Sequence, residues 1–201
     1  MCKNWNFYVK TLFSDLNLGK FCNISDSILN SRFVIGCVSE KLSNQFIGQW
    51  KDRLNSVTSL SGQGRNKLRT YKLFKNDFET ENFCNIPLPY RHRSAFAKFR
   101  CGTAPLRIET GRYENLSVSN RTCHVCAHDI EDEAHVLLHC PLYDNFREIL
   151  FVESESYDEN FINLCDEQKL KFLFSNVDIL RLCAKTCHLI LNTRRNFIYC
   201  K

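Results

Sequence analysis

Glycine and proline are scarce in this chain, which has seven Gly and four Pro among 201 residues. Their scarcity excludes collagen-like, propeller and Gly-rich low-complexity proteins. No apolar run approaches the roughly 18 residues that a membrane span needs. The first residues also lack the apolar core of a secretory signal. With 44% hydrophobic and 24% charged residues, the composition predicts an intracellular globular protein without a membrane partner, and it favours neither nucleus nor cytoplasm.

The familiar catalytic motifs are also missing. The sequence contains no Gly-rich phosphate loop, no G-x-S-x-G and no H-E-x-x-H. Nowhere do two Asp residues stand side by side, as a pair that clamps catalytic metal ions would. These absences predict a protein that is not an enzyme and has no small-molecule substrate.

Cysteine, by contrast, is abundant, with twelve residues. A disulfide framework is typical of shorter, exported chains. Nine cysteines stand singly among apolar or helix-forming neighbours, and we expect them to be small buried hydrophobes. These nine are Cys2, Cys22, Cys37, Cys84, Cys101, Cys165, Cys183, Cys187 and Cys200. The other three occur together with histidines.

The segment from Cys123 to Cys140 has the form C-x2-C-x8-H-x4-C, with Cys126 and His135 between. A Cys-x-x-Cys turn lets two thiolates bind one ion from a single loop, and a second pair on a short helix completes a tetrahedron. His135 and Cys140 are five residues apart, so both can face one side ahead of Pro141. Sulfur and nitrogen donors in this arrangement predict a bound Zn2+.

The fourth ligand is open at this stage, because His139 could replace Cys140 and give a Cys2His2 set. His124 and His128 would then be exposed or lie outside the ligands. The alternative without a metal is a set of reduced core cysteines beside a chance histidine. Four of the six histidines lie between residues 124 and 139, which favours the metal site.

Charge is distributed unevenly. Residues 65–112 carry eleven basic and four acidic side chains, whereas residues 113–160 carry two basic and eleven acidic ones. The basic stretch has the composition of a phosphate-contacting surface, although its arginines could instead pair with the acidic block. Phe96 within it is expected in the core. The candidate nucleic-acid-binding residues are Arg91, Arg93, Lys98, Arg100, Arg107 and Arg112.

Apolar spacing predicts an all-α, helical bundle-like domain with a small zinc-stabilised Cys2-His-Cys insert. We expect helices near residues 5–16, 26–54, 68–78, 90–101, 142–150, 166–174 and 177–198. Gly19 and Gly102 would end two of them, and only weak strand signals occur at 107–108 and 116–118. The expected organisation is an N-terminal helical region (1–56), a linker (57–65) and a region of basic helices, zinc-binding module and C-terminal helices (66–201).

Six short segments, taken in their order along the chain, carry a resemblance to a known family. They are 67–75 (KLRTYKLFK), 96–102 (FAKFRCG), 108–113 (IETGRY), the Cys-x-x-Cys, 131–135 (EDEAH) and 140–143 (CPLY). Over about residues 66–150 the chain resembles the zinc-binding C-terminal region of non-LTR (LINE- or jockey-like) retrotransposon reverse transcriptases. Segment 184–191 (AKTCHLIL), followed by Arg194 and Arg195, resembles the tail of such elements.

This resemblance implies the zinc ligands Cys123, Cys126, His135 and Cys140, and a role in gripping template RNA or target DNA. The polymerase Asp pair and the endonuclease motifs of the family are missing from this sequence. We therefore expect a non-catalytic tail module that binds the phosphate backbone of RNA or DNA. The alternatives are a structural zinc module for protein–protein interaction, or a relic without a selected function.

Overall fold

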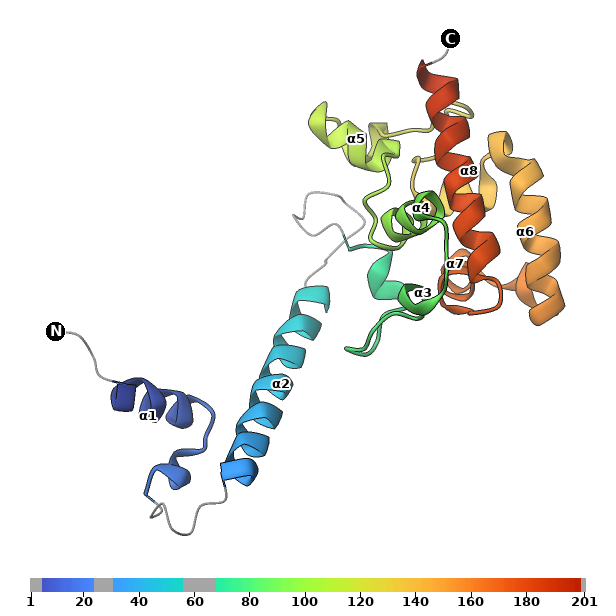
Figure 1. Cartoon of the computed structure of the whole chain (residues 1–201). Helices are drawn as coiled ribbons and strands as arrows, with labels where there is room; N and C mark the ends of the chain where they lie inside the picture. The colour runs from blue at the N-terminus through green and yellow to red at the C-terminus, as the bar shows by residue number, and fades with distance from the viewer. Residues whose placement is uncertain (1–4, 24–30, 56–67, 200–201) are drawn as a thin grey trace. The chain divides into compact units, whose positions relative to one another are not determined.

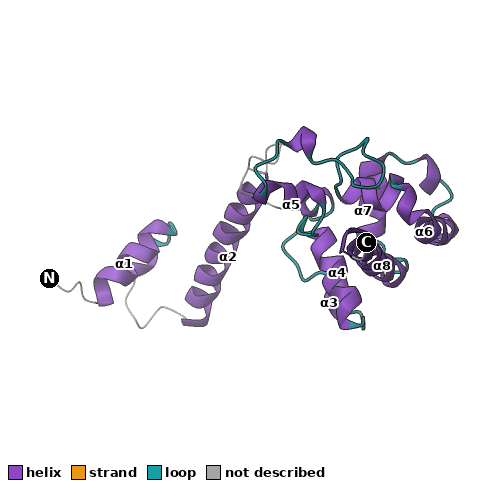
Figure 2. Cartoon of the chain, turned by 90° about the horizontal axis from the view of Figure 1, so that it is seen from above, coloured by secondary structure: helices purple, strands orange, loops and turns teal. Residues whose placement is uncertain are grey.

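The structure is a computed structural model that describes residues 5–23, 31–55 and 68–199. Within these ranges the regular structure is helical, and the only β pairing is an isolated antiparallel bridge between Thr122 and Ile130. Figure 2 accordingly shows helices and loops and no strand in the described part. The predicted all-α class is confirmed. None of the described helices is long and apolar enough to cross a membrane.

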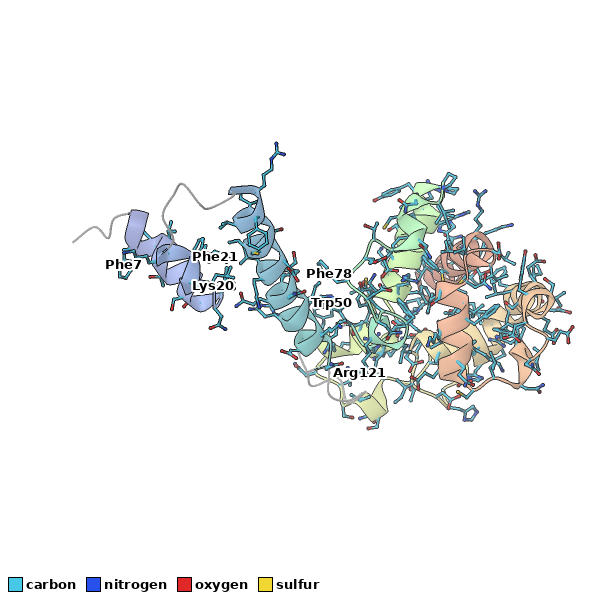
Figure 3. All side chains as sticks on the ribbon, turned by 90° about the horizontal axis from the view of Figure 1, so that it is seen from below. Phe7, Lys20, Phe21, Trp50, Phe78 and Arg121 are labelled. Atoms are coloured by element: carbon cyan, nitrogen blue, oxygen red, sulfur yellow. The ribbon has the colours of Figure 1, made fainter. Side chains whose placement is uncertain are left out.

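The chain divides into two compact units, residues 1–56 and residues 57–201. The first contains α1 (Trp5–Asp15), a 3-10 helix η1 (Gly19–Asn23) and α2 (Ser31–Asn55). In this unit the Lys20 ammonium lies 5.3 Å from the centre of the Phe21 ring, and Figure 3 labels both residues. The predicted linker 57–65 lies outside the described residues.

Helix α1 agrees with the predicted range 5–16 to within one residue, but Asn17 rather than Gly19 ends it. Asn17 adopts a left-handed conformation with φ of 56°, and the Leu18 N–H donates to the Phe13 carbonyl at 2.7 Å. Asparagine tolerates this conformation better than most residues, so it can occupy the position after a helix that glycine usually fills. The helix therefore stops at Asp15.

The second unit contains eleven helical elements in its described part, residues 68–199. They are η2 (Tyr71–Leu73), α3 (Asn82–Asn85), α4 (Tyr90–Arg100), α5 (Arg107–Tyr113), η3 (Val118–Asn120), η4 (His135–His139), η5 (Pro141–Tyr143), α6 (Asp144–Tyr157), η6 (Phe161–Asn163), α7 (Asp166–Ser175) and α8 (Leu180–Tyr199). Gly102 ends α4 as predicted: its φ is 64°, and the Thr103 N–H donates to the Lys98 carbonyl at 2.8 Å.

Helix α8 is the centre of this unit, because it packs against α4, α6 and α7 (Figure 1). The largest buried side chains come from all four helices and from the 3-10 turns, the π turn and the loops between them. Phe96 of α4 is fully buried, with its ring 5.4 Å from Phe83 and 5.6 Å from Phe174. The expectation that Phe96 belongs to the core is confirmed.

Two local predictions are wrong. The helix expected over residues 68–78 is reduced to the single 3-10 turn η2, and the Lys75 ammonium donates to the Glu79 carbonyl at 2.6 Å. The weak strand signals at 107–108 and 116–118 also fail, because α5 begins at Arg107 and η3 begins at Val118. Contacts with distant parts of the chain override the local pattern in these segments.

The lone cysteines are less buried than predicted. Cys183 and Cys187 are buried in α8, and Cys37 and Cys101 are partly buried. Cys22, Cys84 and Cys165 are exposed, so the expectation is wrong for these three. Cys2 and Cys200 lie outside the described residues.

Candidate metal centre and basic groove

The Cys-x-x-Cys loop is held at the tip of a short hairpin. Its two sides are joined by the bridge between Thr122 and Ile130, and the Cys123 N–H donates to the Asp129 carbonyl at 2.8 Å. Ala127 turns the chain back with φ of 59°. The hairpin therefore presents both cysteine side chains from one tight turn.

The second pair of candidate ligands comes from a π-helical turn, η4. The Cys140 N–H donates to the His135 carbonyl five residues earlier, at 2.8 Å. In an α-helix, residues five apart are rotated by about 140° and face different sides. The wider π turn reduces this rotation. It therefore explains how a five-residue spacing can bring His135 and Cys140 to the same side.

Neighbouring side chains fix both ends of this turn. The Asp132 carboxylate accepts a hydrogen bond from the His135 N–H at 2.8 Å. The Arg147 guanidinium of α6 donates to the Leu137 carbonyl at 3.2 Å and to the Cys140 carbonyl at 2.6 Å. These contacts anchor the turn to the helical core.

Cys123, Cys126 and His135 form a cluster that can hold a metal ion. Their donor atoms, two sulfurs and a ring nitrogen, all lie within 4.8 Å of one another. The Cys126 Sγ is 3.4 Å from the His135 Nε2. Cys140 is not part of this cluster, although its Sγ lies 3.8 Å from the Cys123 Sγ.

Two donor pairs, Cys123 with Cys140 and Cys126 with His135, have spacings that tetrahedral coordination of one ion would require. Zinc–sulfur bonds of about 2.3 Å and zinc–nitrogen bonds of about 2.05 Å place tetrahedral donors roughly 3.8 Å apart for S···S and 3.5 Å for S···N. The observed distances are 3.8 Å for Cys123 to Cys140 and 3.4 Å for Cys126 to His135. A three-sulfur, one-nitrogen donor set also suits zinc.

The pKa values of the candidate ligands show which protonation states a bound cation would have to change. Burial raises the pKa of Cys140 to about 12 and also raises that of Cys123. Burial opposes the ionisation of Cys126 too, but hydrogen bonds from backbone N–H groups outweigh it and lower its pKa. Burial lowers the pKa of His135, which favours the neutral imidazole that metals bind. A bound cation would favour the thiolates.

The two ring nitrogens of His135 have different surroundings: Nε2 faces the Cys126 sulfur, and Nδ1 does not. The His135 Nδ1 is buried without a hydrogen-bond partner among the described residues, and the nearest carboxylate oxygen, on Asp129, is 3.7 Å away.

His139 is exposed, and its Nε2 lies 2.6 Å from the Asp166 carboxylate. Because His139 is engaged with Asp166, Cys140 is favoured over His139 as the fourth donor. His124 and His128 are exposed.

The acidic residues around the motif are engaged by arginines from other elements. Glu131 is buried and forms a two-bond ion pair with Arg194 of α8, at 2.7 and 2.6 Å. Glu133 is paired in the same way with Arg69, at 3.0 and 2.7 Å. Glu131 also accepts the Arg107 backbone N–H at 2.7 Å. These contacts tie the segment that carries the candidate metal ligands to Arg69 ahead of η2, to α5 and to α8.

Four of the predicted nucleic-acid contacts have partners inside the protein. Arg93 donates to the carbonyls of residues 83, 84 and 86. Arg100 is only 3% exposed, lies 3.9 Å from the Phe74 ring centre, and binds Glu81 and a backbone carbonyl. Their charges therefore stabilise the fold.

The other two partnered arginines lie on α5. The Arg107 guanidinium is paired with Glu114 at 2.7 Å. Arg112 lies 3.3 Å from the Glu109 carboxylate. Both guanidinium groups are thus neutralised by carboxylates of the same segment.

The remaining two, Arg91 and Lys98, are exposed on α4. Neither side chain has a hydrogen-bond or ion-pair partner among the described residues. Both line a hollow of about 410 Å³ between α4 and α8. An adjoining hollow of about 270 Å³ shares Lys98, His188 and Arg195 with the first. We call the two hollows together the α4–α8 groove.

The groove is basic because neither helix contains an acidic residue. On α8 it is lined by His188, Asn192 and Arg195, whose spacing places them on one helical face. The residues lining the larger hollow are Tyr90, Arg91, Ser94, Ala95 and Lys98 of α4 and His188, Leu191, Asn192 and Arg195 of α8.

The sequence prediction missed the α8 side of this groove. Arg195 and His188 stand far along the chain from the basic block of residues 65–112. The available signal was the absence of Asp and Glu from residues 180–199, read together with the helical spacing.

No protein-family model, no curated protein and no solved structure matches this chain. The candidate metal centre and the α4–α8 groove are therefore the features that bear on function.

Proposed function

We propose that this chain is a zinc-stabilised, non-catalytic module that binds the phosphate backbone of nucleic acid through the α4–α8 groove. The observation that carries the proposal is a groove lined by Arg91, Lys98 and Arg195, between two helices without acidic residues. Such a concentration of unneutralised positive charge attracts polyanions.

In this proposal Cys123, Cys126, His135 and Cys140 bind Zn2+. The ion would compensate three thiolates and join the hairpin to the π turn. Because four protein donors complete a tetrahedron, no position is left for a water molecule, and the site is structural rather than catalytic. The Asp129 carboxylate, near the His135 Nδ1, would orient the imidazole.

The metal centre would also support the groove. Glu131 lies between the hairpin and the π turn, and it holds Arg194, the residue next to Arg195. Zinc binding would therefore stabilise the C-terminal half of α8 and with it one wall of the groove.

The order of the sequence motifs supports the further proposal that the module derives from the C-terminal region of a non-LTR retrotransposon reverse transcriptase. In such an element the groove would hold template RNA or target DNA beside the polymerase. The isolated chain should then show no primer extension on an RNA template, because it lacks an Asp pair for two-metal catalysis.

The test of the binding function is fluorescence anisotropy with a labelled single-stranded RNA and a labelled DNA duplex at several salt concentrations. Three phosphate contacts imply a slope of log affinity on log salt of about −2 for the single strand. Arg91→Gln and Lys98→Gln should each reduce that slope by about 0.7 and weaken binding to all sequences alike.

The matched control is Lys171→Gln, which removes one charge from an exposed position of α7 that lines neither hollow. It should leave the affinity and the salt slope unchanged. An equal effect of Lys171→Gln and Lys98→Gln would indicate attraction to net charge rather than binding in the groove.

The second candidate is a structural zinc module for protein–protein interaction. The observation that favours it is the internal pairing of basic and acidic segments, as in Arg69 with Glu133 and Arg194 with Glu131. Flat titration curves for both nucleic acids at low salt would make this the better account.

A further inference from the structure

The α4–α8 groove combines charge with an exposed aromatic ring. Tyr90, the first residue of α4, is 83% exposed and lines the larger hollow beside Arg91. Its hydroxyl has no hydrogen-bond partner among the described residues. An aromatic ring in water at the mouth of a positively charged hollow is the combination on which unstacked bases bind.

The hollow is of a size for one nucleotide. Its volume of about 410 Å³ falls at the lower end of the range of roughly 300–1,000 Å³ for small-ligand sites. Its lining comes from both α4 and α8. The bases of a duplex are already stacked and paired, so a duplex would contact only the charged rim.

The hollow also offers hydrogen-bonding groups. The Asn192 Oδ1 accepts a hydrogen bond from Arg195 at 2.8 Å, which leaves the Asn192 amide donors for a base edge or a phosphate oxygen. Ser94 adds a hydroxyl from the α4 side. Lys98 and Arg195, further along the two helices, can contact the phosphates on the other side of the same nucleotide.

We propose that the α4–α8 groove is a site for single-stranded nucleic acid, in which one base stacks on Tyr90 while Arg91, Lys98 and Arg195 contact the flanking phosphates. This inference rests on the proposed nucleic-acid-binding function and specifies its ligand. It makes Tyr90 the residue that distinguishes single strands from duplexes.

The experiment compares the affinities of the full chain, loaded with zinc, for a labelled single strand of about 12 nucleotides and for a duplex of the same sequence. Tyr90→Ala should weaken single-strand binding about tenfold or more and change duplex binding less than twofold, since stacking requires an unpaired base. Tyr90→Phe, which keeps the ring, should bind like the wild type. Thermal unfolding establishes that each variant is folded.

The matched control is Tyr113→Ala, which removes another exposed tyrosine, 79% accessible at the end of α5 and outside the groove. It should leave both affinities unchanged. An independent readout is photochemical crosslinking of a 4-thiouridine-labelled strand, with the adduct mapped by mass spectrometry. The crosslink should fall on residues 90–98 or 188–195.

The outcomes separate the two proposals. If Tyr90→Ala weakens both ligands equally or neither, while Arg91→Gln still weakens both, the stacking site is overturned and the phosphate-binding function stands. If the wild-type chain binds neither ligand at low salt, both proposals fail. A folded Tyr90→Ala variant that loses only single-strand binding supports the site.

Discussion

Glu131 and Arg194 form a buried, two-bond ion pair that joins the hairpin of the candidate metal centre to α8. The Arg194 Nε lies 2.7 Å from one carboxylate oxygen and its Nη2 lies 2.6 Å from the other. Both side chains are almost completely buried. Through this pair, the segment that carries the candidate metal ligands is connected to one wall of the basic groove.

Glu131→Gln should destabilise the second unit by about 3–5 kcal/mol, because it removes the carboxylate charge that faces the buried Arg194 guanidinium. The measurement is urea unfolding followed by circular dichroism. The control is Glu114→Gln, which removes the half-exposed partner of Arg107 and should cost far less, because solvent screens an exposed pair. Equal losses from the two variants would contradict the role given to the buried pair.

Gly111→Ala should also destabilise the second unit, by about 1–3 kcal/mol. A Cβ at Gly111 would lie 2.7 Å from the Arg121 Cγ, and Arg121 cannot move away because its guanidinium is bound to the Ile108 and Leu116 carbonyls. Gly48→Ala in α2 meets no atom within 4 Å and should be neutral or stabilising. A thermal unfolding series that ranks the two variants the other way would exclude this explanation.

Binding to nucleic acid should strengthen as the pH falls below about 6.5. Burial, followed by the neighbouring His92, Arg91 and Arg195, lowers the pKa of His188, so the free protein holds this side chain neutral at pH 7. A bound phosphate favours the protonated form and raises that pKa, so complex formation takes up a proton and gains affinity at lower pH.

Anisotropy titrations between pH 5.5 and 8 measure this effect, and His188→Gln should flatten the profile. For unfolding the sign is opposite: a depressed histidine pKa makes the folded state bind fewer protons than the unfolded chain. His188 therefore costs stability as the pH falls through about 6.5. A pH profile that is unchanged in His188→Gln would contradict the assignment.

The sequence predicted the helices and the ligand cluster well where local rules decide the outcome. Helical spacing and Gly102 placed α4 within one residue of its observed end. The C-x2-C-x8-H-x4-C spacing brought Cys123, Cys126 and His135 together, although the π turn between His135 and Cys140 has no recognised signal in the sequence.

The basic surface could not be predicted in the same way, because it depends on which distant segments return to each arginine. Arg100 has the same local setting as Lys98, yet it is buried by Phe74, Glu81 and the Phe174 carbonyl. Those partners lie up to 74 residues away. Composition alone therefore overestimated the exposed charge on α4.

The choice of fourth ligand predicts different behaviour for two neighbouring substitutions. Cys140→Ser should release the metal or weaken its binding strongly, because it removes a donor 3.8 Å from the Cys123 sulfur. His139→Ala should retain the metal, since His139 is engaged with Asp166. A colorimetric zinc-release assay measures both. Retention by Cys140→Ser together with release by His139→Ala would show that the ligand set is Cys2His2.

Removal of the metal should loosen the groove as well as the hairpin. A chelator should increase amide hydrogen exchange over residues 121–143, because structural zinc sites contribute on the order of 10 kcal/mol to folding. Exchange should also increase in the C-terminal half of α8, through Arg194, and nucleic-acid affinity should fall. Faster exchange in the hairpin alone, with unchanged affinity, would contradict the coupling between the two sites.

The most direct test of the central claim is the metal content of the chain purified without added zinc, measured by inductively coupled plasma mass spectrometry. The account predicts one zinc per chain in the wild type and in Cys165→Ser, whose exposed thiol lies outside the cluster. It predicts loss of the metal in Cys126→Ser. A wild-type chain that is folded and free of metal, or equal metal content in Cys126→Ser and Cys165→Ser, would contradict it.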